Sequence, residues 1–565
     1  MKCLGTIILL FNLTLFLPLP GQVQPGEGEA LHHSYVYFQD SLCSGAQFYT
    51  LRIYDSEQAI REEKVLRIQQ MRLPGMQLSG FDWGKTYYWQ FTVKFGGDKS
   101  RKLPIHHFSI REPLYQSFDT IALNVRTNQK DKNAGGWIAI DYTRSVYDRE
   151  GNRIWTLPMI PGLVEERTHI RDLKFTKENT VTFLTIPIPL EIDLQGKVLW
   201  QAPYPFLYEQ DSVLYHHELQ KTSRGTYLVL ADRKVWRRVP GAFAPEDLKT
   251  EFDVKVVNGE VYKKVLMALV LEFNREGKLL WSWDANPYVK EEDLNYKKTK
   301  RGFPNLATHA NALRESADGK KIYVGFRDLS RIVKIDKQSG KVETSYGEKY
   351  PSGEAAFGNG LFLNQHDAFL TNHRSLLVFN NNGALAPTGV SSIIELRDPC
   401  GPKDSILLWR FDLNFDTLSN GKSMNGGSVA ELPNHNILLC GGSLNRIFEV
   451  TRDKKVVWDV FLSARGKGDA QWQPMPQYRC HFVKEWKESH SILEVRALKN
   501  KGLQSTYEVI LHNTGQVSTV QSLEFLNASG KVIKDIRCKP VKPGESLVLK
   551  GQLTLPESAM SIRLR

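Results

Sequence analysis

The stretch Asp148-Arg-Glu-Gly-Asn-Arg-Ile-Trp155 contains a phrase that recurs along the middle of the chain. The phrase is an acidic or polar turn with a glycine, then a basic residue, apolar residues and a tryptophan. Close copies are Asp193-Leu-Gln-Gly-Lys-Val-Leu-Trp200 and Asn274-Arg-Glu-Gly-Lys-Leu-Leu-Trp281. A glycine turn between two alternating runs indicates a β-hairpin, so each copy marks a hairpin of a repeated unit.

Three weaker copies extend the repeat to six units, and they are Asp336–Lys341, Ser405–Trp409 and Thr451–Trp458. Two further strand-like runs precede each copy, which gives four strands per unit. Units of this kind predict a six-bladed β-propeller within residues 118–485. The predicted blades are 118–162, 168–205, 212–285, 305–345, 362–412 and 424–463. A pair of β-sandwiches is the alternative, but it would not require so regular a phrase.

The segments on either side of the repeat predict two smaller β domains. Residues 33–112 contain a turn, a strand rich in Tyr and Trp and a closing Phe strand, which favours a fibronectin-III-like sandwich. Residues 490–565 alternate between apolar and polar and predict a C-terminal β-sandwich. The insert 237–265 in the third unit is charged and contains prolines, so we expect a surface excursion that could serve as a lid. The predicted class is therefore all-β.

The N-terminal residues 1–24 have the pattern of a secretory signal: Met1-Lys2, an apolar run, then small and polar residues. The predicted mature protein is exported, to the periplasm or the cell exterior, and no second long apolar stretch predicts an integral membrane segment. Five cysteines remain, and we expect one bridge among Cys400, Cys440 and Cys480. Sparse cysteines without paired spacing argue against a zinc site.

The overall composition narrows the classes of partner. Hydrophobic residues make up 41% and charged residues 24%, which excludes a largely disordered chain. The formal net charge is +12, but the excess is spread along the chain instead of forming blocks, so we expect no nucleic-acid partner. A surface that prefers small anions fits this charge. No nucleotide-binding fingerprint is present, and we expect no cofactor.

Histidines occupy one register of the repeat. Each unit has a second hairpin upstream of the phrase, and the units can be aligned on its turn. The same aligned position before that turn is His169 in the second unit, His309 in the fourth and His366 in the fifth. In the third unit this place is Tyr215, and His217 follows two residues later. Because equivalent strand starts of a propeller face its central channel, these side chains are expected to converge.

Other polar residues accompany the histidines in the same register. Asn311 stands two residues after its histidine, and Arg233 and Arg327 follow the turn glycines of their units by eight residues. Guanidinium groups, an amide and imidazoles suit a tetrahedral oxyanion, and a neutral imidazole can act as nucleophile or base. A packed or surface histidine is the ordinary alternative for any one of them. Three histidines on converging strands also permit a metal site.

These segments resemble the bacterial PAPS-independent arylsulfate sulfotransferases. The resemblance rests on Tyr215-His-His-Glu-Leu, Thr308-His-Ala-Asn-Ala-Leu, Gly325-Phe-Arg327-Asp-Leu-Ser-Arg and Asn364-Gln-His366-Asp. It covers roughly residues 33–480 and implies a secretory signal, an N-terminal sandwich and a six-bladed propeller whose channel holds the site. Two departures are Asp367, where a small hydroxyl residue is common, and the C-terminal sandwich.

The resemblance implies that His366 is transiently sulfated, that His309, Asn311 and Arg327 hold the sulfuryl oxygens, and that His217 or its neighbour His216 acts on the phenolic oxygen. The predicted reaction is a transfer of a sulfuryl group from an aryl sulfate to a phenol through a sulfo-histidine. We predict Tyr215, His169, His216 and Arg233 as further substrate-binding residues. Asp367 is expected to point away from the channel, where it pairs with a basic residue.

Three other functions remain open from the sequence. A quinone-dependent dehydrogenase would explain the Gly-Lys-apolar-apolar-Trp phrase, but the chain lacks an adjacent cysteine pair. A metal-dependent hydrolase or lyase would use His169, His309 and His366 as ligands, whereas the main prediction has no metal. A non-enzymatic binding propeller would need none of them for catalysis. The expected partners are small aryl sulfates and phenols, and the oligomeric state is left open.

Overall fold

The computed structural model describes residues 23–564 except 44, 114–117, 239–253, 297–307, 350, 353–355, 383–388, 399–405, 467, 486–490, 516–517, 519, 557 and 560. Helix is confined, in this described part, to α1 (Glu57–Arg61), α2 (Glu291–Tyr296) and a 3₁₀ turn at Gly442–Leu444. The all-β prediction is confirmed. None of the described helices has the length and apolarity that crossing a membrane requires.

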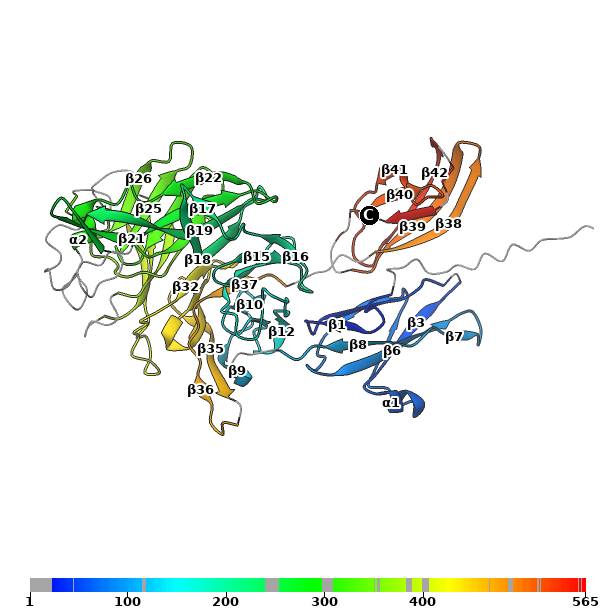
Figure 1. Cartoon of the computed structure of the whole chain (residues 1–565). Helices are drawn as coiled ribbons and strands as arrows, with labels where there is room; N and C mark the ends of the chain where they lie inside the picture. Colours follow the sequence, from blue (N-terminus) through cyan, green and yellow to red (C-terminus); the bar gives the residue numbers. More distant parts are fainter. Residues whose placement is uncertain are drawn as a thin grey trace, which may run out of the picture. The chain divides into compact units, whose positions relative to one another are not determined.

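The chain divides into two compact units, Pro113–Glu485 and the combination of Met1–Glu112 with Trp486–Arg565. Six sheets follow one another in the first of these, which we call the six-sheet unit (Figure 1), and all their strand pairs are antiparallel except the short last pair of the fourth sheet. The first sheet has the order β12 (Arg153–Thr156), β11 (Ser145–Tyr147), β10 (Trp137–Ile140) and β37 (Cys480–Val483). The second contains β13 (Arg171–Phe175), β14 (Val181–Leu184), β15 (Pro189–Ile192) and β16 (Val198–Gln201).

The third sheet contains β17 (Leu207–Tyr208), β18 (Asp211–Lys221), β19 (Tyr227–Arg238), β20 (Val254–Val257), β21 (Glu260–Phe273) and β22 (Leu279–Asp284). The fourth contains β23 (Ala310–Glu315), β24 (Lys321–Phe326), β25 (Arg331–Asp336), β26 (Val342–Gly347) and β27 (Ala356–Phe357). The fifth contains β28 (Asp367–Leu370), β29 (Leu376–Asn380), β30 (Ser392–Leu396) and β31 (Leu407–Asp412). The sixth contains β32 (Ser428–Glu431), β33 (Ile437–Cys440), β34 (Arg446–Val450), β35 (Val456–Gly466), β36 (Gln473–Pro474) and β9 (Phe118–Asn128).

Strands from the two ends of the six-sheet unit exchange places between the first and last sheets. β9 pairs with β35 in the sixth sheet, and β37 pairs with β10 in the first, where Ile140 lies opposite Cys480. The predicted first repeat, 118–162, is therefore wrong in its opening strand, which belongs to the sixth sheet. The repeat phrase lies in hairpins and carries no information about pairing between chain ends. This exchange ties the last sheet to the first by backbone hydrogen bonds.

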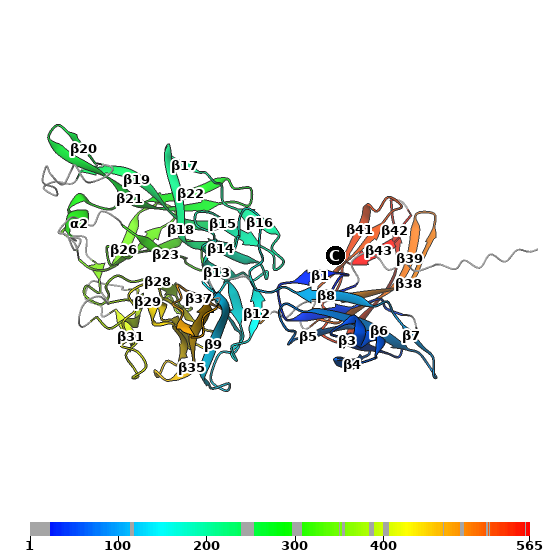
Figure 2. The ribbon, with the colours of Figure 1, turned by 60° about the horizontal axis from the view of Figure 1, so that its bottom comes forward.

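One strand of each sheet meets its counterparts in the neighbouring sheets. β13 contacts β18, β18 contacts β23, β23 contacts β28, β28 contacts β32, β32 contacts β37, and β37 contacts β13 again. We call these six the inner strands. In Figure 2 the labels β13, β18, β23, β28 and β37 lie near the middle of the six-sheet unit, with β12, β16, β22 and β31 farther out. Residues at the starts of the inner strands are thereby brought near one another.

The tryptophans of the repeat phrase link each sheet to the next. Each indole Nε1 donates a hydrogen bond to a backbone carbonyl in the next copy of the phrase: Trp155 to Leu194 (3.0 Å), Trp200 to Asn274 (3.1 Å), Trp281 to Lys337 (2.9 Å), Trp409 to Arg452 (2.8 Å) and Trp458 to Arg149 (2.8 Å). The fourth copy lacks a tryptophan, and at its junction Tyr346 donates to Asp398 Oδ1 at 2.5 Å. We call these contacts the indole clasps.

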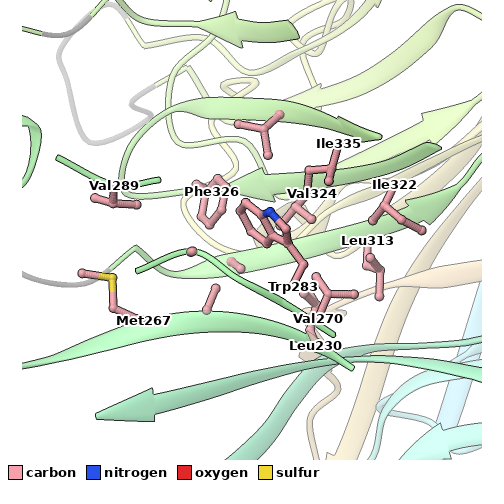
Figure 3. Packing of buried hydrophobic residues seen from close by; sticks show 14 of the residues in the cluster. Leu230, Met267, Val270, Trp283, Val289, Leu313, Ile322, Val324, Phe326 and Ile335 are labelled. Atoms are coloured by element: carbon pink, nitrogen blue, oxygen red, sulfur yellow. The ribbon is translucent and has the colours of Figure 1, made fainter. Parts of the chain in front are cut away.

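Apolar side chains fill the spaces between neighbouring sheets. Figure 3 shows Trp283 of the third sheet among side chains of the fourth, including Val324 and Phe326. Both of these valine and phenylalanine side chains are fully buried. Burial of this size supplies the main favourable free energy of folding, because each large apolar side chain contributes roughly 1.5–3 kcal/mol when removed from water.

The second compact unit has two cores, one in each of its two segments. The N-terminal segment contains the sheet β1 (Glu29–Leu31), β8 (His106–Ile110), β6 (Thr86–Lys94), β3 (Phe48–Tyr54) and β4 (Arg67–Met71), with β7 (Ser100–Lys102) beside β6 and the pair β2 (Val36–Gln39) and β5 (Gly75–Leu78). The C-terminal segment contains β38 (Ser491–Lys501), β39 (Gln504–Asn513) and β42 (Ser546–Thr554) in one sheet and β41 (Val532–Arg537), β40 (Ser522–Leu526) and β43 (Ser561–Leu564) in another. Their assignments as fibronectin-III-like and C-terminal sandwiches stay predictions.

Three sequence predictions fall partly outside the described residues. The signal segment lies almost wholly outside them, and so does Cys400. Cys440 and Cys480 are both free thiols, so a bridge between these two is wrong. Both belong to one hydrophobic cluster, and burial raises the pKa of the Cys480 thiol. In the insert 237–265, β19 and β21 stay paired as far as Arg238 and Tyr262, and β20 pairs with β21, so its described part consists of strands and the turn 258–259.

Replacing Trp155 by Phe tests the indole clasps. The ring of Trp155 is fully buried, and Phe would leave the Leu194 carbonyl without its indole donor. We expect the free energy of unfolding to fall by roughly 1–3 kcal/mol, measured by urea denaturation followed by circular dichroism. Trp472→Phe is the control, because Trp472 is 43% exposed. Equal stability of the two variants would show that the clasps contribute nothing.

Candidate active site

A cavity of about 430 Å³ lies where the inner strands begin. Its lining residues come from all six sheets and their connecting loops: Tyr142, Arg171, Ile186, His216, His217, His309, Arg327, His366, Asn425 and Tyr478. Of the sequence-predicted site residues, the structure thus brings together His216, His217, His309, Arg327 and His366. A second hollow, about 540 Å³, is lined by hairpin turns such as 222–226 and contains none of the predicted residues.

The backbone that carries two of these histidines is strained. His217 and His309 have φ values of 57° and 48°, in the left-handed region that non-glycine residues rarely adopt. The pairing register of β18 shifts between Tyr215 and Leu219, and that of β23 shifts between Ala310 and Ala312. Such β-bulges interrupt the alternation of side chains and re-aim them. This local irregularity presents both imidazoles to the cavity.

His366 is held by a neutral amide. Its Nδ1 lies 2.8 Å from Oδ1 of Asn381, while Nδ2 of Asn381 donates to the carbonyls of Ser423 (2.8 Å) and Gly426 (3.1 Å). Because those two bonds fix which end of the amide faces His366, the facing oxygen can only accept. Nδ1 of His366 therefore carries the proton, and Nε2 keeps its lone pair.

The environment of His366 keeps the imidazole uncharged. Burial lowers the pKa of His366 to about 3, and the positive charges of Arg327 and Arg479 act in the same direction. Asn381 opposes this shift through its hydrogen bond, but it brings no negative charge. A neutral imidazole with a free nitrogen is a nucleophile at physiological pH.

A second chain of groups ends at His217. Its Nδ1 lies 2.7 Å from Nδ1 of His216, and Nε2 of His216 lies 3.1 Å from Oδ2 of Asp232. Burial and the neighbouring His216 and His309 hold the pKa of His217 well below its usual range. The pair of imidazoles can pass a proton between the cavity and the Asp232 carboxylate, because each imidazole has two nitrogens.

His309 and Arg327 form another side of the cavity. The His309 ring lies 5.2 Å from that of His217, and burial lowers the His309 pKa. Arg327 donates its backbone N–H to the His309 carbonyl at 3.0 Å, which ties the two residues together. Its side chain is 28% exposed and has NH1 3.5 Å from Oδ1 of Asp328. A guanidinium beside neutral imidazoles is suited to an anion.

The buried guanidinium of Arg479 joins four segments. Three are the inner strands β13, β18 and β23, and the fourth is the residue directly before the inner strand β28. Arg479 is fully buried, and NH1 donates to Asp172 Oδ1 at 3.0 Å and to Glu218 Oε2. Its NH2 donates to the backbone carbonyl of Asn311 and lies 3.4 Å from that of His366. Arg479 therefore positions the segments that hold two predicted site residues.

A second arginine extends this network, with Glu218 as the shared acceptor. Arg314 donates to Glu218 and, at 2.9 Å, to Asp367 Oδ1, while the N–H of Val429 donates to Asp367 Oδ2. Burial alone would raise the pKa of Glu218, but Arg314 and Arg479 outweigh it and hold that pKa at about 2. Asp367 points away from the imidazole of His366 and pairs with a basic residue, as predicted.

Asn311 and Tyr215 are not among the lining residues. Asn311 is fully buried, and its Nδ2 donates to the Gln365 carbonyl at 2.9 Å. The bulge at Ala310–Ala312 breaks the alternation that was expected to place Asn311 beside His309. Tyr215 is buried in the core of the third sheet, where its hydroxyl donates to Pro203.

His169 and Arg233 also lie away from the cavity lining. Nε2 of His169 accepts a hydrogen bond from Nε of Arg171 at 2.9 Å, so His169 supports a lining residue. Arg233 pairs with three carboxylates of the third sheet: Glu209 (2.8 Å), Asp211 (3.3 Å) and Asp284. Those ion pairs occupy its guanidinium, so the structure offers Arg233 no place at the cavity.

Sequence reasoning missed several residues of the site. Arg171 stands two residues after His169, the same offset that links Tyr215 to His217, so the repeat register contained a signal for it. Asn381 carries no such signal, because it follows β29 in the middle of its sheet. Asn425 precedes the inner strand β32, and Tyr478 precedes β37, whose own His481 is not among the cavity-lining residues.

The described residues contain one group whose ligand atoms lie within 4.8 Å of one another, and it is His373, Glu431 and His435. These residues stand at hairpin turns, and Arg452 donates to Oε1 of Glu431 at 2.8 Å, which places a positive charge where a cation would bind. The ligands of the metal alternative, His169, His309 and His366, do not form such a group in the part of the chain that the structure describes.

A protein-family model matches the central part of the chain. Residues 137–388 match the family model described as arylsulfotransferase (ASST). The matched region includes His217, His309, Arg327 and His366. The match supports a sulfotransferase activity on small aryl substrates. No curated protein matches the chain significantly.

Solved structures that resemble the chain do so at very low identity. A luciferin-regenerating enzyme is 9% identical over 65% of this chain and 96% of its own, with a TM-score of 0.30. Hydrazine synthase of Kuenenia stuttgartiensis is 11% identical over 66% and 96%, with a TM-score of 0.25. Hsv2 of Kluyveromyces lactis is 11% identical over 69% and 96%, with a TM-score of 0.23. Scores this low support no argument about function.

The titration of His366 tests the described environment. We expect its imidazole resonance in protein labelled with ¹³C-histidine to stay constant between about pH 8 and pH 5, because its pKa is far below the usual ~6.5. His366→Asn identifies the signal by its loss. Since the folded state binds fewer protons than the unfolded state between about pH 6.5 and pH 3, this histidine also lowers stability as the pH falls through that window. A midpoint near pH 6.5 would contradict the buried neutral site.

Proposed function

We propose that the six sheets are the blades of a six-bladed propeller and that its cavity transfers a sulfuryl group from an aryl sulfate to a phenol, without PAPS, through a sulfated His366. The observation that carries this proposal is the contact of His366 with Asn381, whose amide is fixed by two carbonyls. It leaves Nε2 of a neutral, buried imidazole as the nucleophile. The family match supports the reaction class.

In the first half-reaction, Nε2 of His366 attacks the sulfur, and the bond between sulfur and the phenolic oxygen breaks. The leaving oxygen takes the proton of Nε2 of His217, and Nδ1 of His217 takes a proton from His216. This proposed step requires both nitrogens of His216 to carry protons at the start, with Nε2 facing Oδ2 of Asp232 at 3.1 Å. The proton is thus stored on His216 while His217, whose pKa is strongly lowered, stays neutral.

In the second half-reaction a phenol occupies the place of the first product. His217 removes its proton and returns one to His216, and the phenolic oxygen attacks the sulfur on His366. The nitrogen–sulfur bond then breaks, and the neutral imidazole is restored. The same relay serves both directions, because the leaving and attacking oxygens use one position.

Arg327 and His309 stabilise the sulfuryl oxygens as the bond loosens. Arg327 contributes a fixed positive charge on the side of the cavity that it shares with His309. Asn311, which sequence analysis assigned to the same task, has a positioning role in this proposal. The side-chain amide of Asn311 donates to the backbone carbonyl of Gln365, next to His366. The backbone carbonyl of Asn311 accepts a hydrogen bond from Arg479.

The predicted export of the chain is part of the proposal. A periplasmic or extracellular enzyme meets aryl sulfates and phenols outside the cytoplasm, where a nucleotide sulfate donor is not supplied. Direct transfer of a sulfuryl group from an aryl sulfate to a phenol requires no nucleotide sulfate donor.

Covalent modification tests the nucleophile. We expect the wild-type enzyme to release one equivalent of 4-nitrophenol rapidly from 4-nitrophenyl sulfate without an acceptor, and the peptide that contains His366 to gain the mass of a sulfuryl group. His366→Asn should abolish both signals, whereas His373→Asn, on an exposed turn, should retain them. A burst that survives in His366→Asn and disappears in His309→Asn would place the nucleophile in the fourth sheet.

Arg327→Lys tests the anion contact. Lysine keeps the positive charge but loses the planar pair of donors that can bind two oxygens together. We expect kcat to fall about 100-fold, which corresponds to roughly 3 kcal/mol of transition-state stabilisation, with a smaller change in KM. Steady-state kinetics with 4-nitrophenyl sulfate measure both constants. A wild-type kcat would show that Arg327 serves only its pair with Asp328.

A further inference from the structure

We propose that Arg171 binds a carboxylate on the aromatic ring of the substrate, so that the preferred phenols and aryl sulfates carry a carboxylate group. The inference rests on the proposed sulfuryl transfer for the position of the phenolic oxygen. It concerns a lining residue to which neither the sequence prediction nor the proposed mechanism gives a task.

Two contacts fix the guanidinium of Arg171 while leaving its outer donors available. Nε donates to Nε2 of His169 at 2.9 Å, and the carbon of the guanidinium lies 4.2 Å from the centre of the Tyr478 ring. Among the described residues, no side chain or carbonyl accepts a hydrogen bond from its two terminal nitrogens. The residue is partly exposed and lines the cavity. A planar fork held in this way matches a carboxylate.

The charges around the cavity favour a second anion. Its lining contains two arginines and no carboxylate. Arg327 has Asp328 within 3.5 Å, but the described chain holds no carboxylate within ion-pair distance of Arg171. Asp141, whose pKa the charge of Arg171 lowers, accepts the N–H groups of Tyr142 and Arg479. Burial raises the pKa of Asp141 to about 7, which weakens it as a counter-charge.

Tyr478 connects the two ends of the cavity. Its ring centre lies 6.1 Å from that of His366 and 6.0 Å from that of His217, and the Arg171 guanidinium lies over the same ring. Tyr142 stacks on Tyr478 with the ring centres 6.4 Å apart. An aromatic substrate with its sulfur at His366 can therefore extend along Tyr478 towards Arg171. Aromatic walls suit the ring, and the guanidinium suits an anionic group at its far end.

A matched pair of acceptors tests the proposal. With 4-nitrophenyl sulfate as donor, we expect the wild-type kcat/KM to be higher for 4-hydroxybenzoate than for its methyl ester. Arg171→Gln should lower the value for 4-hydroxybenzoate roughly 10- to 100-fold, as for a lost charged hydrogen bond, and change the value for the ester less than about threefold. For Arg171→Lys we expect a kcat/KM for 4-hydroxybenzoate between those of the wild type and Arg171→Gln, because lysine keeps the positive charge but lacks the planar pair of donors.

Three outcomes would overturn the proposal. An equal loss with both acceptors would mean that Arg171 binds the sulfuryl group or supports the fold, and a wild-type enzyme without preference would remove the carboxylate. If 4-hydroxybenzenesulfonate is a better acceptor than 4-hydroxybenzoate, the guanidinium of Arg171 serves a tetrahedral anion. Thermal unfolding of each variant shows whether the folded state is retained, and if Arg171→Gln does not fold, Arg171→Lys gives the comparison.

Binding separates this inference from the proposed function. Isothermal titration of His366→Asn with 4-hydroxybenzoate and with its ester needs no turnover. Tighter binding of the carboxylate, lost when Arg171→Gln is added, would uphold the ligand class even if no sulfuryl transfer is found. Sulfuryl transfer without this difference in binding would uphold the reaction and reject the role of Arg171.

Discussion

The buried guanidinium of Arg479 is the interaction on which the centre of the six-sheet unit depends. An arginine that is wholly removed from water is stable only if its donors meet acceptors, because desolvating an unpaired charge costs several kcal/mol. Its acceptors are the carboxylates of Asp172 and Glu218 and the carbonyls of Asn311 and His366. These belong to the second to fifth sheets or their leading residues, while Arg479 directly precedes the last strand of the unit. The residue before the final strand therefore pairs with the carboxylates of Asp172 and Glu218 on the inner strands of earlier sheets.

The same charge also determines the chemistry in front of it. Arg479 is one of the positive groups that lower the pKa values of His217 and His366, and burial is the larger cause for both. Two carboxylates neutralise the guanidinium on its far side, and their own pKa values lie below the usual range. The network thus stays charged at neutral pH while the imidazoles of His217 and His366 stay neutral. Neutral imidazoles beside fixed cations favour nucleophilic attack on an anionic substrate.

The sequence predicted those features that follow from periodicity. The tryptophan phrase, represented by Trp155, identified the repeated hairpins because five of the six copies make the same indole contact with the next copy. The register of His309 and His366 placed them at one cavity for the same reason. Asn381 and Arg479 could not be predicted, because their contacts join segments that no repeat relates. The orientation of Asn311 was predicted wrongly, because alternation along a strand does not hold through a β-bulge.

The periphery and the centre of this unit obey different constraints. At the periphery each indole clasp uses a side chain and a backbone carbonyl, so any sequence that preserves the tryptophan and the turn gives the same junction. At the centre the six inner strands meet at short distances, and identical side chains there would place like charges together. Bulges at His217 and His309 and a left-handed Asp172 remove that equivalence, each at a cost in backbone strain. Divergence among otherwise equivalent strand starts is what lets the fifth sheet contribute His366, the third the pair His216 and His217, and the fourth His309 with Arg327 to one cavity.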